Sequence, residues 1–154
     1  MFKQLLLLAL AVASVSANLN YTNCGGRSQV LAIRVNGCDQ VPCRFSRGHE
    51  YYGEMDVVAA ARTASLPLVI QTTLPPLIQD ILGFALPPNT IFSGDACEDL
   101  ISGRCPTVVG EKITVRLNIY IPNTLLATST NVRVTLRNAE NQVEVCAQLP
   151  VIIV

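Results

Sequence analysis

The chain of 154 residues contains no tryptophan, a single histidine and few charged residues. Charged residues make up 14% of it, and 11 basic residues balance 11 acidic ones, so the formal net charge is zero. A nucleic-acid-binding protein usually presents an excess of positive charge, so this balance argues against a nucleic-acid partner. Half of the residues are hydrophobic, which excludes a disordered chain because so apolar a sequence can bury enough surface to fold. The length fits one domain.

Long hydrophobic runs are also scarce, and the longest lies at the N-terminus. Lys3 precedes the apolar run from Leu5 to Ala13, and the small residues Ser16 and Ala17 follow it. A helix that crosses a bilayer needs about 20 apolar residues, and this run is shorter. The run therefore favours a secretory signal peptide over a membrane anchor. We therefore predict a signal peptide at residues 1–17 and a single domain at residues 18–154. The mature protein is expected to be secreted, or delivered to a lumen such as that of the lysosome.

Six cysteines follow the predicted signal peptide: Cys24, Cys38, Cys43, Cys97, Cys105 and Cys146. An even number in a small exported domain indicates a disulfide framework, although six cysteines allow 15 pairings. Cys38 and Cys43 are close enough in sequence to close a local loop, as are Cys97 and Cys105, which would leave the first and last cysteines. A zinc site is the alternative, but the chain lacks Cys-x2-Cys spacing and has only His49 as a histidine. We predict no metal site.

Apolar residues recur at every second position, which is typical of half-buried β-strands. The clearest alternation runs from Lys112 to Ile121, and similar patterns cover residues 31–35, 51–61 and 132–136. In the first of these, Leu31 is predicted to face inward with its alternate neighbours, and in the second Asp56 is predicted to face outward. Further strands are expected over residues 66–74 and 142–154, with turn signals between the strands. Seven or so short strands predict an all-β, two-sheet antiparallel sandwich.

Residues 74–92 interrupt this pattern. Prolines at both ends bracket an apolar stretch at residues 77–86, in which Leu77, Ile78, Ile81 and Leu82 have helical spacing. One amphipathic helical turn is therefore predicted here, although so short a helix is marginal alone. The segment is either a loop folded onto the core or an apolar flap over an opening.

Residues suited to catalysis are few. His49 is the only histidine of the chain, and it adjoins Gly48 in a predicted hairpin turn. The side chains of the usual hydrolytic triads are therefore not all available. Carboxylates such as Glu98 and Asp99 are expected on a loop surface. We predict a protein that is not an enzyme. Asn20 begins an N-glycosylation sequon, which predicts a surface position.

Several motifs resemble the ML lipid-recognition domain family. They are the order of the six cysteines, the segment Asn23-Cys24-Gly25, residues 41–48 (VPCRFSRG), Cys105-Pro106, and the ending at residues 146–153 (CAQLPVII). Within the family, the chain is most similar to the branch of secreted Niemann-Pick type C sterol carriers and their arthropod relatives. The resemblance covers essentially the whole predicted mature chain. It implies an immunoglobulin-like sandwich with three disulfides, Cys24–Cys146, Cys38–Cys43 and Cys97–Cys105.

The resemblance also implies a hydrophobic lipid cavity between the sheets, without catalysis or cofactor. The inward faces and the apolar 77–86 segment nominate the following lipid-binding residues: Val35, Phe45, Tyr51, Met55, Val57, Leu82, Phe84, Leu86, Val115, Leu117, Ile119, Ile121, Val134 and Leu136. The expected ligand is a sterol, a fatty acid or another apolar lipid, and the protein is expected to act as a monomer with transient membrane or receptor contacts. The alternatives are an accessory lipid-recognition protein of innate immunity or chemical signalling, and a plain adhesion module with a filled core.

Overall fold

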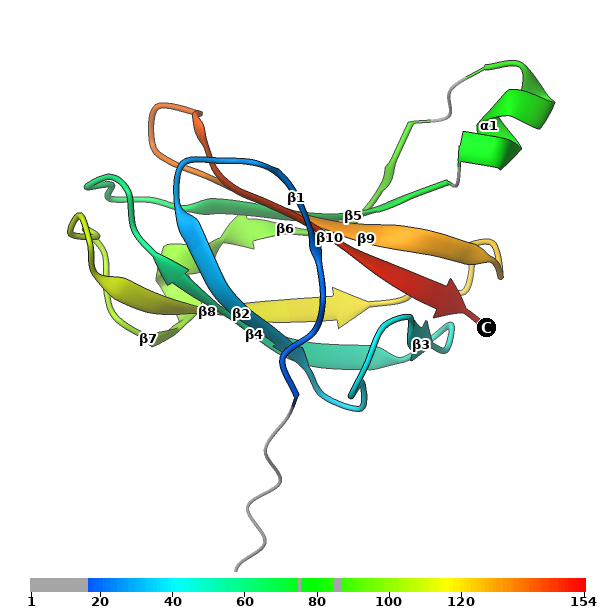
Figure 1. The fold of residues 1–154 in the computed structure, drawn as a ribbon, viewed down its shortest axis with the longest axis horizontal. Coiled ribbons are helices and arrows are strands. Elements are labelled where there is room, and N and C mark those ends of the chain that lie inside the picture. Colours follow the sequence, from blue (N-terminus) through cyan, green and yellow to red (C-terminus); the bar gives the residue numbers. More distant parts are fainter. Residues whose placement is uncertain (1–16, 75, 85–86) are drawn as a thin grey trace, which may run out of the picture.

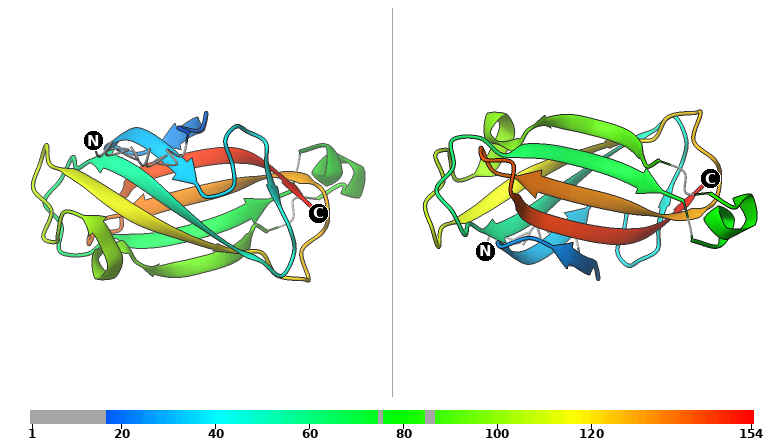
Figure 2. Two further views of the ribbon diagram at one scale, coloured as in Figure 1. Left: turned by 90° about the horizontal axis from the view of Figure 1, so that it is seen from below. Right: turned by 90° about the horizontal axis from the view of Figure 1, so that it is seen from above.

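The computed structural model describes residues 17–74, 76–84 and 87–154, and they form two packed β-sheets (Figures 1 and 2). The strands are β1 (Thr22–Gly25), β2 (Gln29–Val35), β3 (Cys43–Phe45), β4 (Glu50–Val58), β5 (Pro67–Thr73), β6 (Asn89–Asp95), β7 (Leu100–Ser102), β8 (Lys112–Tyr120), β9 (Ser129–Arg137) and β10 (Val143–Ile153). The helical elements are α1 (Pro76–Leu82) and the 3-10 turn η1 (Ala96–Asp99). No helix among the described residues is long and apolar enough to span a membrane.

The sheet topology confirms the predicted all-β sandwich. One sheet has the strand order β1-β10-β9-β5-β6, with β3 added against β10, and the other has the order β2-β4-β8-β7. All pairs are antiparallel except the short parallel pair of β3 and β10. The disulfides are Cys24–Cys146, Cys38–Cys43 and Cys97–Cys105, the set implied by the family resemblance.

Alternating side chains of both sheets build the core. On β8, Ile113, Val115, Leu117 and Ile119 are at most 2% exposed, and on β9 the inward positions from Val132 to Leu136 are equally buried. Their polar neighbours in sequence point away from the core, as the two-residue period of a strand requires. The predicted facing of these two strands is therefore confirmed.

Two side chains depart from the predicted pattern. Leu31 is 46% exposed instead of buried, because the pairing of β2 with β4 shifts register between Val30 and Ala32, and such a bulge reverses the facing of the residues beside it. Asp56 does lie on the outer face of β4, but it is buried. Arg34 donates two hydrogen bonds to its carboxylate, at 2.9 and 3.1 Å, and Thr114 donates a third at 2.8 Å.

The predicted helical turn within residues 77–86 is present as α1. Gly83, with a φ of +73°, ends it, and its amide donates to the Gln79 carbonyl at 3.0 Å, as is usual for a glycine after a helix. Leu77 and Ile81 are 69% and 75% exposed, so the apolar side of α1 does not pack into the core. Figure 1 shows the helix projecting beyond one end of the sandwich, and Figure 2 places it at the same end as the C-terminus.

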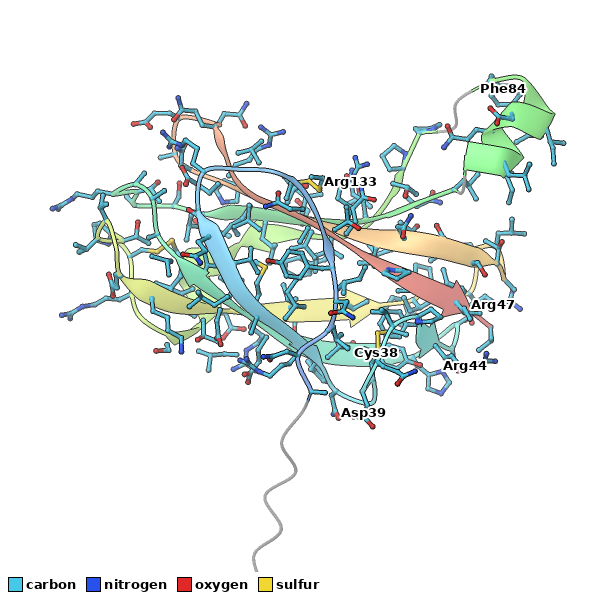
Figure 3. All side chains as sticks on the ribbon, viewed as in Figure 1. Cys38, Asp39, Arg44, Arg47, Phe84 and Arg133 are labelled. Carbon is cyan, nitrogen blue, oxygen red and sulfur yellow. A yellow bond between two sulfur atoms is a disulfide. The ribbon has the colours of Figure 1, made fainter. Side chains whose placement is uncertain are left out.

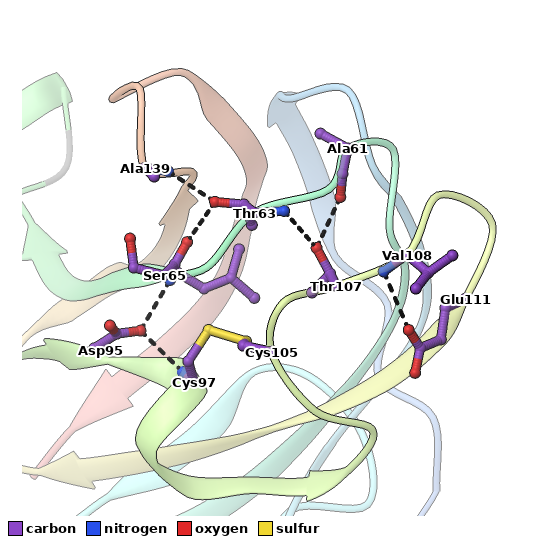
Figure 4. Close-up of a disulfide and its surroundings, with 11 residues drawn as sticks. Ala61, Thr63, Ser65, Asp95, Cys97, Cys105, Thr107, Val108, Glu111 and Ala139 are labelled. Carbon is purple, nitrogen blue, oxygen red and sulfur yellow. Dashed lines mark hydrogen bonds between the residues drawn. A yellow bond between two sulfur atoms is a disulfide. The ribbon is translucent and has the colours of Figure 1, made fainter.

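The opposite end is closed by a disulfide and a hydrogen-bond network (Figure 4). The Thr63 amide donates to Thr107 Oγ1 at 3.0 Å, Thr107 Oγ1 donates to the Ala61 carbonyl at 2.7 Å, and the Ala139 amide donates to Thr63 Oγ1 at 2.9 Å. These bonds join three loops beside the Cys97–Cys105 bridge. This end of the sandwich is therefore tied at several points.

Candidate functional site

One edge of β8 lacks a pairing partner along the second half of the strand. β7 pairs with β8 only at Val115 and Thr114, whereas β8 continues to Tyr120. Beyond that pairing, the edge of β8 faces β6 of the other sheet, and a pocket of about 270 Å³ lies there, which we call the edge pocket. Its lining residues are Glu50, Tyr51, Tyr52, Ile91, Phe92, Asn118, Ile119 and Tyr120.

Strand register brings these residues together. In the β4–β8 pair, Glu50 lies opposite Tyr120, and Tyr51 lies opposite Ile119. From the other sheet, β6 contributes Phe92, which pairs with Ile70 of β5. The chain has only four tyrosines and four phenylalanines, and four of these eight rings line the edge pocket. Aromatic rings with a few polar groups are typical of small-molecule sites.

Hydrogen bonds hold two of the tyrosines in place. The Ser46 amide donates to Tyr51 Oη at 2.7 Å, and the Tyr51 ring lies 4.4 Å from the Phe45 ring between centroids. Tyr52 Oη donates to Glu50 Oε2 at 2.9 Å, and this bond raises the pKa of the Tyr52 phenol above its ordinary value. The Tyr52 phenol therefore stays neutral at physiological pH, and Glu50 is the single charged residue of the lining.

The fourteen predicted lipid-binding residues fall into three groups. Tyr51 and Ile119 line the edge pocket. Nine are buried at 2% exposure or less and pack as core between the sheets: Val35, Phe45, Met55, Val57, Val115, Leu117, Ile121, Val134 and Leu136. Leu82 and Phe84 are 45% and 58% exposed, at and just after the end of α1, and Leu86 lies outside the described residues. Figure 3 shows Phe84 well away from the sandwich body.

Strand alternation alone identifies two of the eight residues that line the edge pocket, Tyr51 and Ile119, and misses the other six. Tyr52 and Tyr120 occupy positions predicted to face solvent, and they reach the pocket because it follows a free strand edge. Phe92 lies in the segment 74–92, which interrupts the alternating pattern, but the end of that segment belongs to β6. The sequence signal that could have found these residues is the scarcity of aromatic residues combined with the adjacent pair Tyr51-Tyr52.

The residue types considered for catalysis and metal binding do not come together. His49 is exposed, and its Nδ1 lies 3.1 Å from the Arg47 carbonyl oxygen. Within residues 17–74, 76–84 and 87–154, no group of three or more histidine, cysteine or acidic side chains is placed to hold a metal ion.

Comparison with known proteins places this fold in a family. The ML domain family matches residues 18–153. The chain belongs to the ML domain family. No curated protein is significantly similar to it in sequence.

Solved structures of similar fold include two with descriptive names. A Niemann-Pick type C2 protein from the Japanese carpenter ant superimposes with a TM-score of 0.71 at 18% identity, covering 88% of this chain and 99% of the ant chain. Chicken MD-1, crystallised with lipid IVa, superimposes with a TM-score of 0.55 at 16% identity, covering 84% of this chain and 85% of its own. At these identities the likeness establishes that this ML domain shares their fold.

Proposed function

We propose that this ML domain is a secreted, non-enzymatic carrier that binds a sterol or another apolar lipid between its sheets and transfers it. The observation that supports the proposal most is the edge pocket, because half of the chain's aromatic rings gather where the unpaired edge of β8 faces β6. Burial of the lipid drives binding, at about 25 cal/mol per Å² of apolar surface.

The pocket's size indicates how a lipid enters. Its volume of about 270 Å³ lies just below the roughly 300–1,000 Å³ of small-molecule sites. We infer that the edge pocket receives one part of the lipid and that the rest enters between the sheets, past Ile119 and Phe92. The predicted lipid-binding residues Val115, Leu117 and Val134, which pack as core between the sheets, would then line the filled cavity.

Export is part of the proposal. The three disulfides suit an oxidising compartment, and the proposed signal peptide at residues 1–17 would direct the chain there. Asn20 is exposed, as a glycosylation acceptor must be. We propose that it carries a glycan in the secreted protein and that the extracellular space or the lysosomal lumen is its destination.

A second candidate function is an accessory lipid-recognition protein of innate immunity or chemical signalling. The fold shared with chicken MD-1, which was crystallised with lipid IVa, favours it. Such a protein would bind lipid and also associate stably with a receptor ectodomain, whereas a carrier releases its lipid to membranes. Vesicle-to-vesicle transfer by the purified protein therefore distinguishes the carrier from the accessory protein.

The absence of tryptophan allows a direct test of the site. Phe92→Trp places a single tryptophan, which can be excited selectively, in the edge pocket. Tyr21→Trp, a matched aromatic change at a partly buried residue outside the pocket, is the control. On titration of the delipidated variants with cholesterol, we expect the Phe92→Trp emission to shift to shorter wavelength as lipid displaces water, while the control emission stays constant.

Three other results would change the conclusion. Cholesterol binding with no response from Phe92→Trp would place the opening elsewhere. If the protein binds fatty acid but not cholesterol, the proposed ligand becomes a fatty acid instead of a sterol. Failure of the delipidated protein to bind any lipid, together with the absence of co-purifying lipid by mass spectrometry, would refute the carrier and favour an adhesion module with a filled core.

A further inference from the structure

One buried hydroxyl group in the core lacks a partner. Thr130 lies on the inward face of β9, in line with Val132 and Val134, and is 7% exposed. Among the described residues its Oγ1 is the buried side-chain oxygen with no hydrogen-bond partner. An unpaired buried hydroxyl destabilises a folded protein, and valine would fill the same space without this cost. Its presence therefore points to a partner that the chain itself does not supply.

A small niche adjoins this hydroxyl at the α1 end of the sandwich. Its volume is about 30 Å³, enough for one or two non-hydrogen atoms of a ligand or one water. Four threonines, one asparagine and four aliphatic side chains line it, and none of them is charged. Thr72 of β5 is among them, 4% exposed, and it points inward because it pairs with Val132. The niche thus offers hydroxyl groups in an otherwise apolar wall.

The niche and the edge pocket lie on the same strand. Asn89 at the start of β6 lines the niche, and Ile91, two residues along, lines the edge pocket. Likewise, β8 ends at the edge pocket with Tyr120, and the loop that follows it contributes Leu125 to the niche. A lipid that enters through the edge pocket can therefore present one end to Thr130 and its remaining length to the apolar core.

We propose that Thr130, together with Thr72, binds the hydroxyl head group of an uncharged lipid alcohol, such as a sterol or a fatty alcohol. The inference rests on the proposed carrier function and adds the orientation and class of the ligand. A threonine hydroxyl both donates and accepts, which matches an alcohol. A fatty-acid carboxylate would be buried there without a countercharge, which is strongly unfavourable. The head group lies toward α1 and the apolar body among the inward residues of β8 and β9.

The test compares three probes that share a chain length: 1-hexadecanol, palmitic acid and hexadecane. Their affinities are measured by displacement of N-phenyl-1-naphthylamine from the delipidated wild type and its variants. Thr130→Val removes the hydroxyl with little change of shape and should weaken 1-hexadecanol binding about five- to tenfold, with hexadecane unchanged. The same variant should raise the Tm of the lipid-free protein by a few degrees, because it removes the unpaired hydroxyl.

Two control variants separate the hydroxyl from packing. Thr130→Ser keeps the hydroxyl and should bind 1-hexadecanol nearly as the wild type does, while its Tm falls because a buried methyl group is lost. Thr135→Val, at a residue of β9 that does not face the core, should change neither affinity nor Tm.

The outcomes distinguish this inference from the function on which it rests. Equal binding of 1-hexadecanol by wild type and Thr130→Val would refute the proposed head-group site at Thr130 and show that its hydroxyl holds only a buried water. The carrier function would not be affected by this result. Tighter binding of palmitic acid than of 1-hexadecanol, lost in Thr130→Val, would refute the uncharged head group. If the wild type binds none of the three probes, both the carrier function and the proposed head-group site at Thr130 are refuted.

Discussion

Leu117 gives the most direct test of the core, because it is fully buried on the most regular strand. It lies opposite Gly53 of β4, which has no side chain that could move into a space left by truncation. Leucine-to-alanine changes in cores cost about 2–5 kcal/mol, and more where the site cannot collapse, so Leu117→Ala should cost about 3–5 kcal/mol. Leu117→Asp adds an unpaired buried carboxylate and should leave the protein unfolded at 25 °C, since total stabilities are about 5–15 kcal/mol. Guanidinium unfolding followed by circular dichroism measures both variants.

Arg116, the preceding residue, is the matched control. Its side chain is 41% exposed and pairs with Asp99, itself 62% exposed, at 3.0 Å. Exposed ion pairs contribute about 0–1 kcal/mol, so Arg116→Asp should lower the free energy of unfolding by about 1 kcal/mol or less. Equal losses for Leu117→Ala and Arg116→Asp would refute the assignment of inward and outward faces on β8, and with it the proposed cavity wall.

Three further predictions concern the Cys24–Cys146 disulfide, the stability in acid, and the exposed residues at the end of α1. Replacing Cys24 and Cys146 by serine should cost about 4–5 kcal/mol in guanidinium unfolding, because the bond closes 122 residues; a loss below about 1 kcal/mol would contradict this. Burial raises the pKa of Glu144, but hydrogen bonds from Arg27, Ser28 and Asn138 outweigh it and hold the pKa below its ordinary value. The ionised Glu144 therefore stabilises the fold fully above the unfolded pKa of about 4.3, and this stabilisation is lost as the pH falls through the lower pKa of the folded state. Glu144→Gln should therefore flatten the decline of Tm below about pH 4.3. An unchanged profile of Tm against pH would contradict this prediction. Leu82→Ser with Phe84→Ala should slow lipid transfer between vesicles while Tm stays constant, because both side chains are exposed; a collapse of Tm with intact transfer would show that they act as core.

The sandwich follows from local patterns in the sequence, and the full set of three disulfides follows from the family resemblance. The two-residue period of β8 and β9 determines which side chains are buried, because a strand with one buried face admits one register. The alternation does not predict the exposure of Leu31, because the bulge beside it depends on the pairing of two strands and is not visible in the sequence pattern of one strand. Nor does it predict the burial of Asp56, because this burial results from Arg34 and Thr114 on neighbouring strands.

The sequence determines the candidate site less directly than it determines the core. Alternation identifies inward residues such as Val115, but it cannot distinguish a side chain that packs from one that lines a cavity. The edge pocket arises where β7 stops short and β8 continues, which is a property of strand lengths in two different parts of the chain. Tyr52 and Tyr120 therefore became site residues through topology, although the period of their strands predicts a solvent-facing position.

The two ends of the sandwich differ in how firmly they are held, and this difference bears on how a lipid could enter. At one end, the Cys97–Cys105 disulfide and the hydrogen bonds of Thr63 and Thr107 join the loops. At the other end, β3 pairs with β10 and the Cys38–Cys43 disulfide closes the loop beside it. The same end holds the edge pocket, the exposed helix α1 and the unpaired hydroxyl of Thr130. Local opening is least costly where few buried contacts must break. The sheets should therefore separate first beside the edge pocket, on the side of the α1 end away from β3, so that a lipid can enter there while the tied end preserves the fold.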